Sequence, residues 1–211
     1  MLHERRESNS MNIFYNENGV GDVLLVQLAL TKPETVLVET KGDVALVLNE
    51  ETKEVVAFNL FNASSYVELV DNGEVKLTEE LVDQIQKALV KNNVELELDA
   101  DFTPKFVVGH VLAIEGHPNA DRLNVCSVDV GNETLQIVCG ASNIAAGQKV
   151  VVAKVGAVMP SGMVIRDAEL RGVASSGMVC SATELSLPDA VENVGILVLD
   201  DEFVVGESFV K

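Results

Sequence analysis

A short segment in the second half of the chain, ASSGMVCSATEL at positions 174–185, groups small hydroxyl residues with a glycine and a cysteine. Such a cluster could supply a nucleophile if a general base lay beside Cys180 or one of the serines. The chain has three histidines that could act as this base: His3, His110 and His117. No serine stands in a G-x-S-x-G elbow, so we expect no catalytic residue and no enzyme activity.

The same segment also has a structural interpretation. Gly177 would permit a tight backbone where something bulky comes close, and Met178 and Cys180 would pack in an apolar core. Metal chemistry finds little support, because His117 and Asp121 share a turn but cannot complete a ligand set. We therefore expect neither a metal nor a cofactor.

The first half of the chain alternates β-rich runs with turn signals. VGDVLLVQL and TVLVETKGDVALVLNEETKEVVAFNLF are punctuated by TKPE, KGD and NEETK. Apolar residues then recur at helical spacing, which predicts a helix from roughly Thr78, a good N-cap, to Asn92. The apolar stripe of this helix needs a covering partner. We predict an independently folded α+β domain over residues 11–102, with an antiparallel sheet and one helix.

The first ten residues, MLHERRESNS, are polar and lack a signal-peptide core. We interpret them as a tail or extension, with Met11 as the alternative natural start. No run approaches the ~18–20 apolar residues of a membrane span, so we expect no membrane partner. The three cysteines are odd in number and lie among apolar residues, which favours reduced thiols and a cytoplasmic protein.

A domain boundary is expected near residues 101–105, where the acidic run VELELDADFTPKF ends. From Phe106 onward, short strands with glycine and proline punctuation predict a β-sandwich or a small barrel. In LNVCSVDV the apolar phase slips by one residue between Val125 and Cys126. This slip predicts a β-bulge within that strand.

Two segments carry a family resemblance: HPNADRLNVCSVDVG and QIVCGASNIAAGQKVVVAKVGAVMPSGMVIRDAELRGVASSGMVCSATELSL. They resemble the tRNA-binding domain of bacterial phenylalanyl-tRNA synthetase β subunits, of methionyl-tRNA synthetase C-termini and of stand-alone tRNA-binding proteins. With the β-rich domain in front, the whole chain resembles the YtpR-like bacterial family. The resemblance implies an all-β oligonucleotide-binding (OB) fold barrel with extra C-terminal strands over residues 103–211, which binds tRNA by shape. The family usually has glycine where this chain has Ser186, and we expect only a local change there.

The resemblance also implies which residues contact RNA. Ser175 and Met178 would lie on the tRNA-facing surface, where small residues let the RNA backbone approach. Arg122 stands at a position that is commonly basic in the family. Asn143 suits RNA contact and a structural cap equally, and any single lysine could instead be merely solvated. The complete predicted set is Arg122, Asn143, Lys149, Lys154, Arg171, Ser175, Met178 and Ser181.

Charge limits how this binding can work. The chain has 15 Lys+Arg against 33 Asp+Glu, for a net charge of −18, which argues against unspecific adhesion to nucleic acid or membranes. Residues 140–180 hold four basic and two acidic residues, a local net charge of +2. We therefore expect tRNA binding that is weak, shape-selective and strongly salt-dependent.

Two further hypotheses remain open. In one, the OB domain has little RNA affinity and the chain is a protein-interaction adaptor, as its acidity would allow. The other concerns assembly, because stand-alone relatives resemble dimers built by a segment after the barrel. Here that segment, NVGILVLDDEFVVGESFVK, is rich in apolar residues from Ile196 to Val210. It predicts a homodimer, or else packing of this segment on the N-terminal domain.

Overall fold

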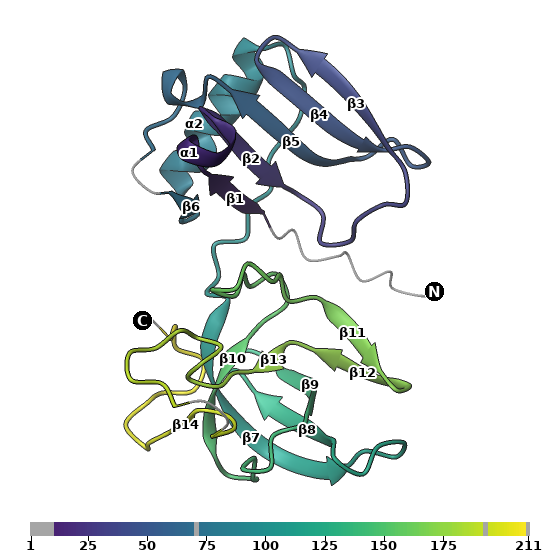
Figure 1. Ribbon diagram of the computed structural model, residues 1–211, viewed down its shortest axis with the longest axis vertical. Coiled ribbons are helices and arrows are strands. Elements are labelled where there is room, and N and C mark those ends of the chain that lie inside the picture. Colours follow the sequence, from purple (N-terminus) through teal and green to yellow (C-terminus); the bar gives the residue numbers. More distant parts are fainter. Residues whose placement is uncertain (1–10, 70–71, 192–193, 210–211) are drawn as a thin grey trace. The chain divides into compact units, whose positions relative to one another are not determined.

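The computed structural model in Figure 1 describes residues 11–69, 72–191 and 194–209. The chain divides into two compact units, Met1–Phe102 and Thr103–Lys211. The predicted tail at residues 1–10 and Val210 of the apolar C-terminal segment lie outside the described residues. In the part of the chain that is described, no helix has the length and apolar character needed to cross a membrane.

The N-terminal unit is a six-stranded antiparallel sheet with the strand order β3-β4-β5-β2-β1-β6. Its strands are β1 (Asn12–Tyr15), β2 (Val23–Gln27), β3 (Val36–Lys41), β4 (Val44–Asn49), β5 (Val55–Phe61) and β6 (Gly73–Glu74). Two short helical segments, α1 (Glu17–Val20) and the 3-10 turn Ala63–Ser65, connect strands. The strand β3 forms one edge of the sheet, and every one of its residues is exposed.

The helix α2 (Glu79–Lys91) covers one face of this sheet (Figure 1). It begins at Thr78, whose hydroxyl accepts a hydrogen bond from the backbone N–H of Leu81 at 3.2 Å. Its buried side packs with sheet residues such as Phe58, and each fully buried aliphatic side chain contributes about 1.5–3 kcal/mol. The predicted helix and the α+β class of this region are confirmed.

The C-terminal unit is an OB-like, barrel-type sheet with the strand order β13-β10-β7-β8-β9. Its strands are β7 (Phe106–Gly116), β8 (Asn124–Asp129), β9 (Thr134–Cys139), β10 (Lys149–Ala153) and β13 (Met178–Val179). A separate hairpin is formed by β11 (Asp167–Leu170) and β12 (Val173–Ser176), and β14 (Val198–Leu199) adds to β10. The predicted fold class, including strands after the barrel, is confirmed.

The predicted bulge in the strand around Val125 is wrong. The strand β8 pairs with β9 in unbroken register, and it buries Cys126 and Val128 while Val125 stays partly exposed. The register shift lies in β7 instead, between Val111 and Ala113, so Leu112 is the extra residue. The shift occurs in β7 because this eleven-residue strand pairs with β10 along its first half and with β8 along its second half. An extra residue helps such a strand to bend.

Much of the C-terminal segment packs on its own barrel. Ile196 is buried in the barrel core, and Leu197, Leu199 and Phe209 pack against a second apolar cluster of the same unit. The barrel itself therefore covers part of the apolar segment for which we predicted a partner. Among the described residues of this segment, the large apolar side chains that remain exposed are Val194, Val198, Phe203 and Val204.

Candidate nucleic-acid interface

The tip of the β11–β12 hairpin presents an arginine. Arg171 and Gly172 form the two-residue connection, and both have positive φ angles, of 50° and 85°. Such a connection matches the right-handed twist of the two strands, although it places a non-glycine residue in the left-handed region. The Arg171 side chain is consequently exposed at the far end of the hairpin.

A second exposed arginine stands beside this tip. His117 is buried, and its Nε2 lies 2.9 Å from the carbonyl oxygen of Leu170. Its Nδ1 accepts a hydrogen bond from the backbone N–H of Asn119 at 3.0 Å. The Nδ1 acceptor role leaves the proton on Nε2, which donates to that carbonyl. The Asn119 side chain donates to the carbonyl of Arg171 at 3.0 Å. These bonds join the turn that carries Arg122 to the hairpin tip that carries Arg171.

The side chains of Arg122, Arg166 and Arg171 form no hydrogen bond or ion pair with any described residue. Asp167 and Glu169 are also exposed on the hairpin, so the positive potential is limited to the arginine positions. Sequence reasoning found Arg122 and Arg171 but missed the roles of His117 and Asn119. The signal in the sequence was the HPNAD turn, because its histidine and asparagine side chains can hydrogen-bond to the backbone of a distant hairpin.

The predicted contact residue Ser175 serves the barrel instead, and so does its neighbour Gly177. Ser175 is only 4% exposed, and its hydroxyl accepts the backbone N–H of Val138 at 3.0 Å. The prediction that Ser175 lies on the outer surface is therefore wrong. Gly177 has a φ of 109°, and a side chain there would meet the carbonyl oxygen of Ala153 at 3.0 Å. The small residues of this segment accommodate the neighbouring strands β9 and β10.

The two predicted lysines are already engaged. The Lys149 ammonium donates to the carbonyls of Asp201 and Phe203 at 2.8 and 2.7 Å. The Lys154 ammonium lies 2.8 Å from Glu133 Oε1, and its side chain is 16% exposed. Both ammonium groups thus stabilise loops of the barrel. Within the described residues of this unit, the cationic side chains without a partner are therefore the arginines.

Asn143 holds the chain segment that follows the barrel. Its amide donates to the carbonyl of Ile196 at 2.9 Å and accepts the N–H of Ile196 at 3.0 Å. The side-chain amide thus makes the same two hydrogen bonds to the Ile196 backbone that a neighbouring antiparallel strand would make. Of the two roles predicted for Asn143, the hydrogen bonds favour the structural one. The structural role differs from the predicted cap, because the side chain binds a distant segment and no helical turn.

Ser181 begins a single helical turn that is capped at both ends. Its N–H and hydroxyl both donate to Glu184 Oε2 at 2.7 Å, and its hydroxyl accepts the N–H of Glu184 at 3.1 Å. This is a capping box. At the other end Leu187 N–H bonds Ala182 O and Ser186 N–H bonds Thr183 O, the two bonds of a Schellman motif.

The Schellman motif accounts for the glycine that the family resemblance implies at position 186. Ser186 occupies its left-handed position with a φ of 52°, where glycine has no steric penalty. The variant Ser186→Gly is expected to raise the free energy of unfolding of this unit by up to about 1 kcal/mol, since relief of strain outweighs the added unfolded-chain entropy. Thermal melting should rise by a few degrees, roughly 4–8 °C per kcal/mol. Ser186→Ala is the control, because alanine keeps the strain and should give no increase.

The buried thiols are poorly suited to nucleophilic chemistry. Burial, with a smaller effect from Cys139, raises the pKa of Cys126 to about 11, and burial is also the largest cause of the raised pKa of Cys139. Cys180 is fully buried. No group of three metal-ligating side chains occurs among the described residues. The segment that raised the question of catalysis thus contributes core and turn residues.

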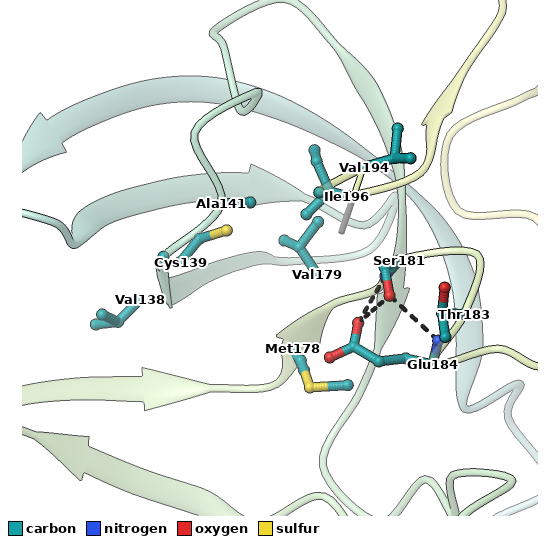
Figure 2. A pocket seen from close by; sticks show the side chains of 12 residues that line it. Val138, Cys139, Ala141, Met178, Val179, Ser181, Thr183, Glu184, Val194 and Ile196 are labelled. Atoms are coloured by element: carbon teal, nitrogen blue, oxygen red, sulfur yellow. Dashed lines mark hydrogen bonds between the residues drawn. The ribbon is translucent and has the colours of Figure 1, made fainter. Parts of the chain in front are cut away.

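Figure 2 shows the pocket beside the hairpin, with a volume of about 550 Å³. Met178 and Ser181 from the predicted set line it together with Glu184. The walls come from the end of β9, from β13, from the capped turn and from the segment that Asn143 holds. Its apolar lining residues are Val138, Cys139, Ala141, Met178, Val179, Val194 and Ile196.

Comparisons with known proteins match both units. Residues 106–208 match the family described as "Putative tRNA binding domain", and residues 31–101 match "Domain of unknown function (DUF4479)". The chain is 58% identical over 199 residues to "Putative tRNA-binding protein YtpR" of Bacillus subtilis, covering 94% of this chain and 99% of that protein.

Some relatives match a shorter part of this chain. The "Phenylalanine--tRNA ligase beta subunit" of Oleidesulfovibrio alaskensis is 58% identical over 106 residues, which are 50% of this chain and 13% of that subunit. A crystal structure of the C-terminal domain of Plasmodium vivax p43 is 28% identical, with a TM-score of 0.36, over 48% of this chain and 56% of that one.

Proposed function

The chain belongs to the YtpR family, and from this premise we propose that it binds tRNA through its C-terminal unit and catalyses no reaction. The observation that carries the proposal is the juxtaposition of Arg122 and Arg171, which hydrogen bonds from His117 and Asn119 hold at one end of the barrel. Both guanidinium groups are free of partners within the described residues. Arginine pairs with phosphate through two parallel hydrogen bonds, so this end suits an RNA backbone.

Recognition by shape follows from the small number of cations. Two or three phosphate contacts contribute little affinity through charge alone. The net charge of −18 repels nucleic acid from the rest of the chain. The spacing of the arginines then decides which RNA surface fits, since phosphate contacts fix register and orientation. The raised pKa values of the buried Cys126 and Cys139 support a binding role without covalent chemistry.

A mobility shift of the full chain with total tRNA tests the proposal. Two or three phosphate contacts predict a loss of affinity of roughly 10- to 40-fold between about 50 and about 200 mM salt. Absence of a shift at low salt would overturn tRNA binding.

The adaptor hypothesis is supported by the edge strand β3. Val36, Leu37 and Val38 are 46%, 36% and 63% exposed, and the outer edge of this strand pairs with no described strand. Such an edge suits addition of a strand from another protein. A chain that fails to shift tRNA at low salt yet binds a protein partner through residues 36–38 would favour this second function.

We also propose a homodimer in the cytoplasm. The exposed Val198, Phe203 and Val204 in the C-terminal segment support a contact between copies, which would bring two arginine pairs onto one assembly. The three free, buried cysteines suit a reducing compartment. Sedimentation of the full chain distinguishes the dimer from a monomer.

A further inference from the structure

The pocket beside the hairpin contains an unused hydrogen-bond acceptor. One carboxylate oxygen of Glu184, Oε2, accepts two hydrogen bonds from Ser181. The other oxygen, Oε1, is bonded by no described residue, and Figure 2 shows it turned away from Ser181. The capping box fixes the carboxylate of this exposed residue, so Oε1 is held on the pocket lining, bonded by no described residue and accessible to a ligand.

The rest of the lining suits a flat apolar ring. Val138, Met178, Val179 and Ile196 contribute apolar walls around a volume of about 550 Å³, which is within the usual range for small-ligand sites. Nucleobases combine apolar faces with hydrogen-bonding edges, and unstacked bases in RNA are bound in this way. Methionine adapts readily to such a surface.

The chemistry of Oε1 selects among the bases. A carboxylate oxygen accepts hydrogen bonds and donates none, so it pairs with an exocyclic amino group, as on cytosine or adenine. Uracil presents a carbonyl oxygen at the position where cytosine carries its amino group. An uncompensated acceptor facing another acceptor costs binding energy, so the pocket should discriminate between two rings of nearly equal size.

A short stretch of chain connects the pocket to Arg171. One segment runs from Arg171 at the hairpin tip through β12 to Met178 at the pocket. Seven residues span at most about 25 Å, so one RNA strand can bind both places. Phosphates would contact the arginines while a nearby unstacked base enters the pocket.

We propose that this pocket binds one unstacked base with an exocyclic amino group, cytosine or adenine, from a single-stranded stretch of bound RNA. The inference rests on the proposed tRNA binding and adds the part of the RNA that is recognised by base. Glu184 is the specificity-determining residue, and Ser181 is the positioning residue that holds its carboxylate.

The test compares the wild-type chain with Glu184→Gln, by anisotropy with oligocytidylate and oligouridylate of one length. Glutamine also completes a capping box, so its oxygen can keep the Ser181 bonds while an amino group replaces Oε1. The wild type should bind oligocytidylate roughly 5- to 20-fold more tightly than oligouridylate. The variant should lose or reverse this preference, with unchanged melting.

Glu202→Gln is the matched control, because it removes the same charge from an exposed position of the same unit outside the pocket. This control should keep the cytosine preference. Equal binding of both oligonucleotides by the wild type, or a preference that survives in Glu184→Gln, would overturn the base pocket. A parallel shift with total tRNA separates the two claims: tRNA binding without base preference leaves the proposed function standing and removes only the pocket.

Discussion

The double variant Arg122→Glu, Arg171→Glu is expected to bind tRNA at least about 100-fold more weakly than the wild type at low salt. Each arginine is exposed and has no partner among the described residues. Hydrogen bonds from His117 and Asn119 join the two segments that carry the arginines. A hydrogen bond to a charged group contributes about 1.5–3 kcal/mol, and two such losses exceed a factor of 100 before repulsion is counted. Fluorescence anisotropy with labelled tRNA measures the change.

The salt dependence gives a second readout of the same variant. Loss of two phosphate contacts should reduce the slope of log affinity against log salt by about 2. The variant Lys32→Glu, Lys41→Glu is the matched control, since it changes charge equally at exposed positions of the N-terminal unit. If the control and the arginine variant lose affinity to the same extent, only net charge matters and the proposed interface is wrong.

The helix α2 and the strands could be predicted because their signals are local. The N-cap at Thr78 and the apolar spacing from Leu81 to Leu89 lie within one segment, and α2 buries that stripe. The alternation of β-rich runs and turns likewise led to the sheet of the N-terminal unit. These patterns depend on neighbours within a few residues, so a single sequence contains them.

The bulge was predicted in the wrong strand because a shift in the apolar alternation does not indicate which of two paired strands carries the extra residue. In β8 the partly exposed Val125 belongs to an ordinary strand, and Leu112 of β7 is the inserted residue. Valine is common on both faces of strands, so its presence in one parity is weak evidence for an inward side chain.

The candidate site was less predictable, because its residues are defined by partners far along the chain. The buried Ser175 accepts a hydrogen bond from the backbone of Val138, and Lys149 donates to carbonyls more than fifty positions away. Family motifs pointed to a region of the barrel but could not separate residues that support the barrel from residues on its surface. Arg122 and Arg171 were predicted from the family motifs, and the turn and the hairpin tip that expose both side chains became evident only in the structure.

Asn143→Ala should have the largest effect on the stability of the C-terminal unit among the predicted site residues. Alanine removes both hydrogen bonds to Ile196, whose backbone lies at a position only 6% exposed. Leaving two such groups without partners costs roughly 2–4 kcal/mol. The expected fall in melting temperature is on the order of 10 °C or more, measured by calorimetry of the full chain.

The same substitution distinguishes a structural Asn143 from one that contacts RNA. A residue that only holds Ile196 should leave tRNA affinity nearly unchanged well below the melting transition, although the pocket wall at Ile196 becomes loose and any cytosine preference should shrink. Ser142→Ala, at an exposed neighbouring position, should melt as the wild type does. An Asn143→Ala chain with normal melting but weakened tRNA binding would instead assign this side chain to the RNA.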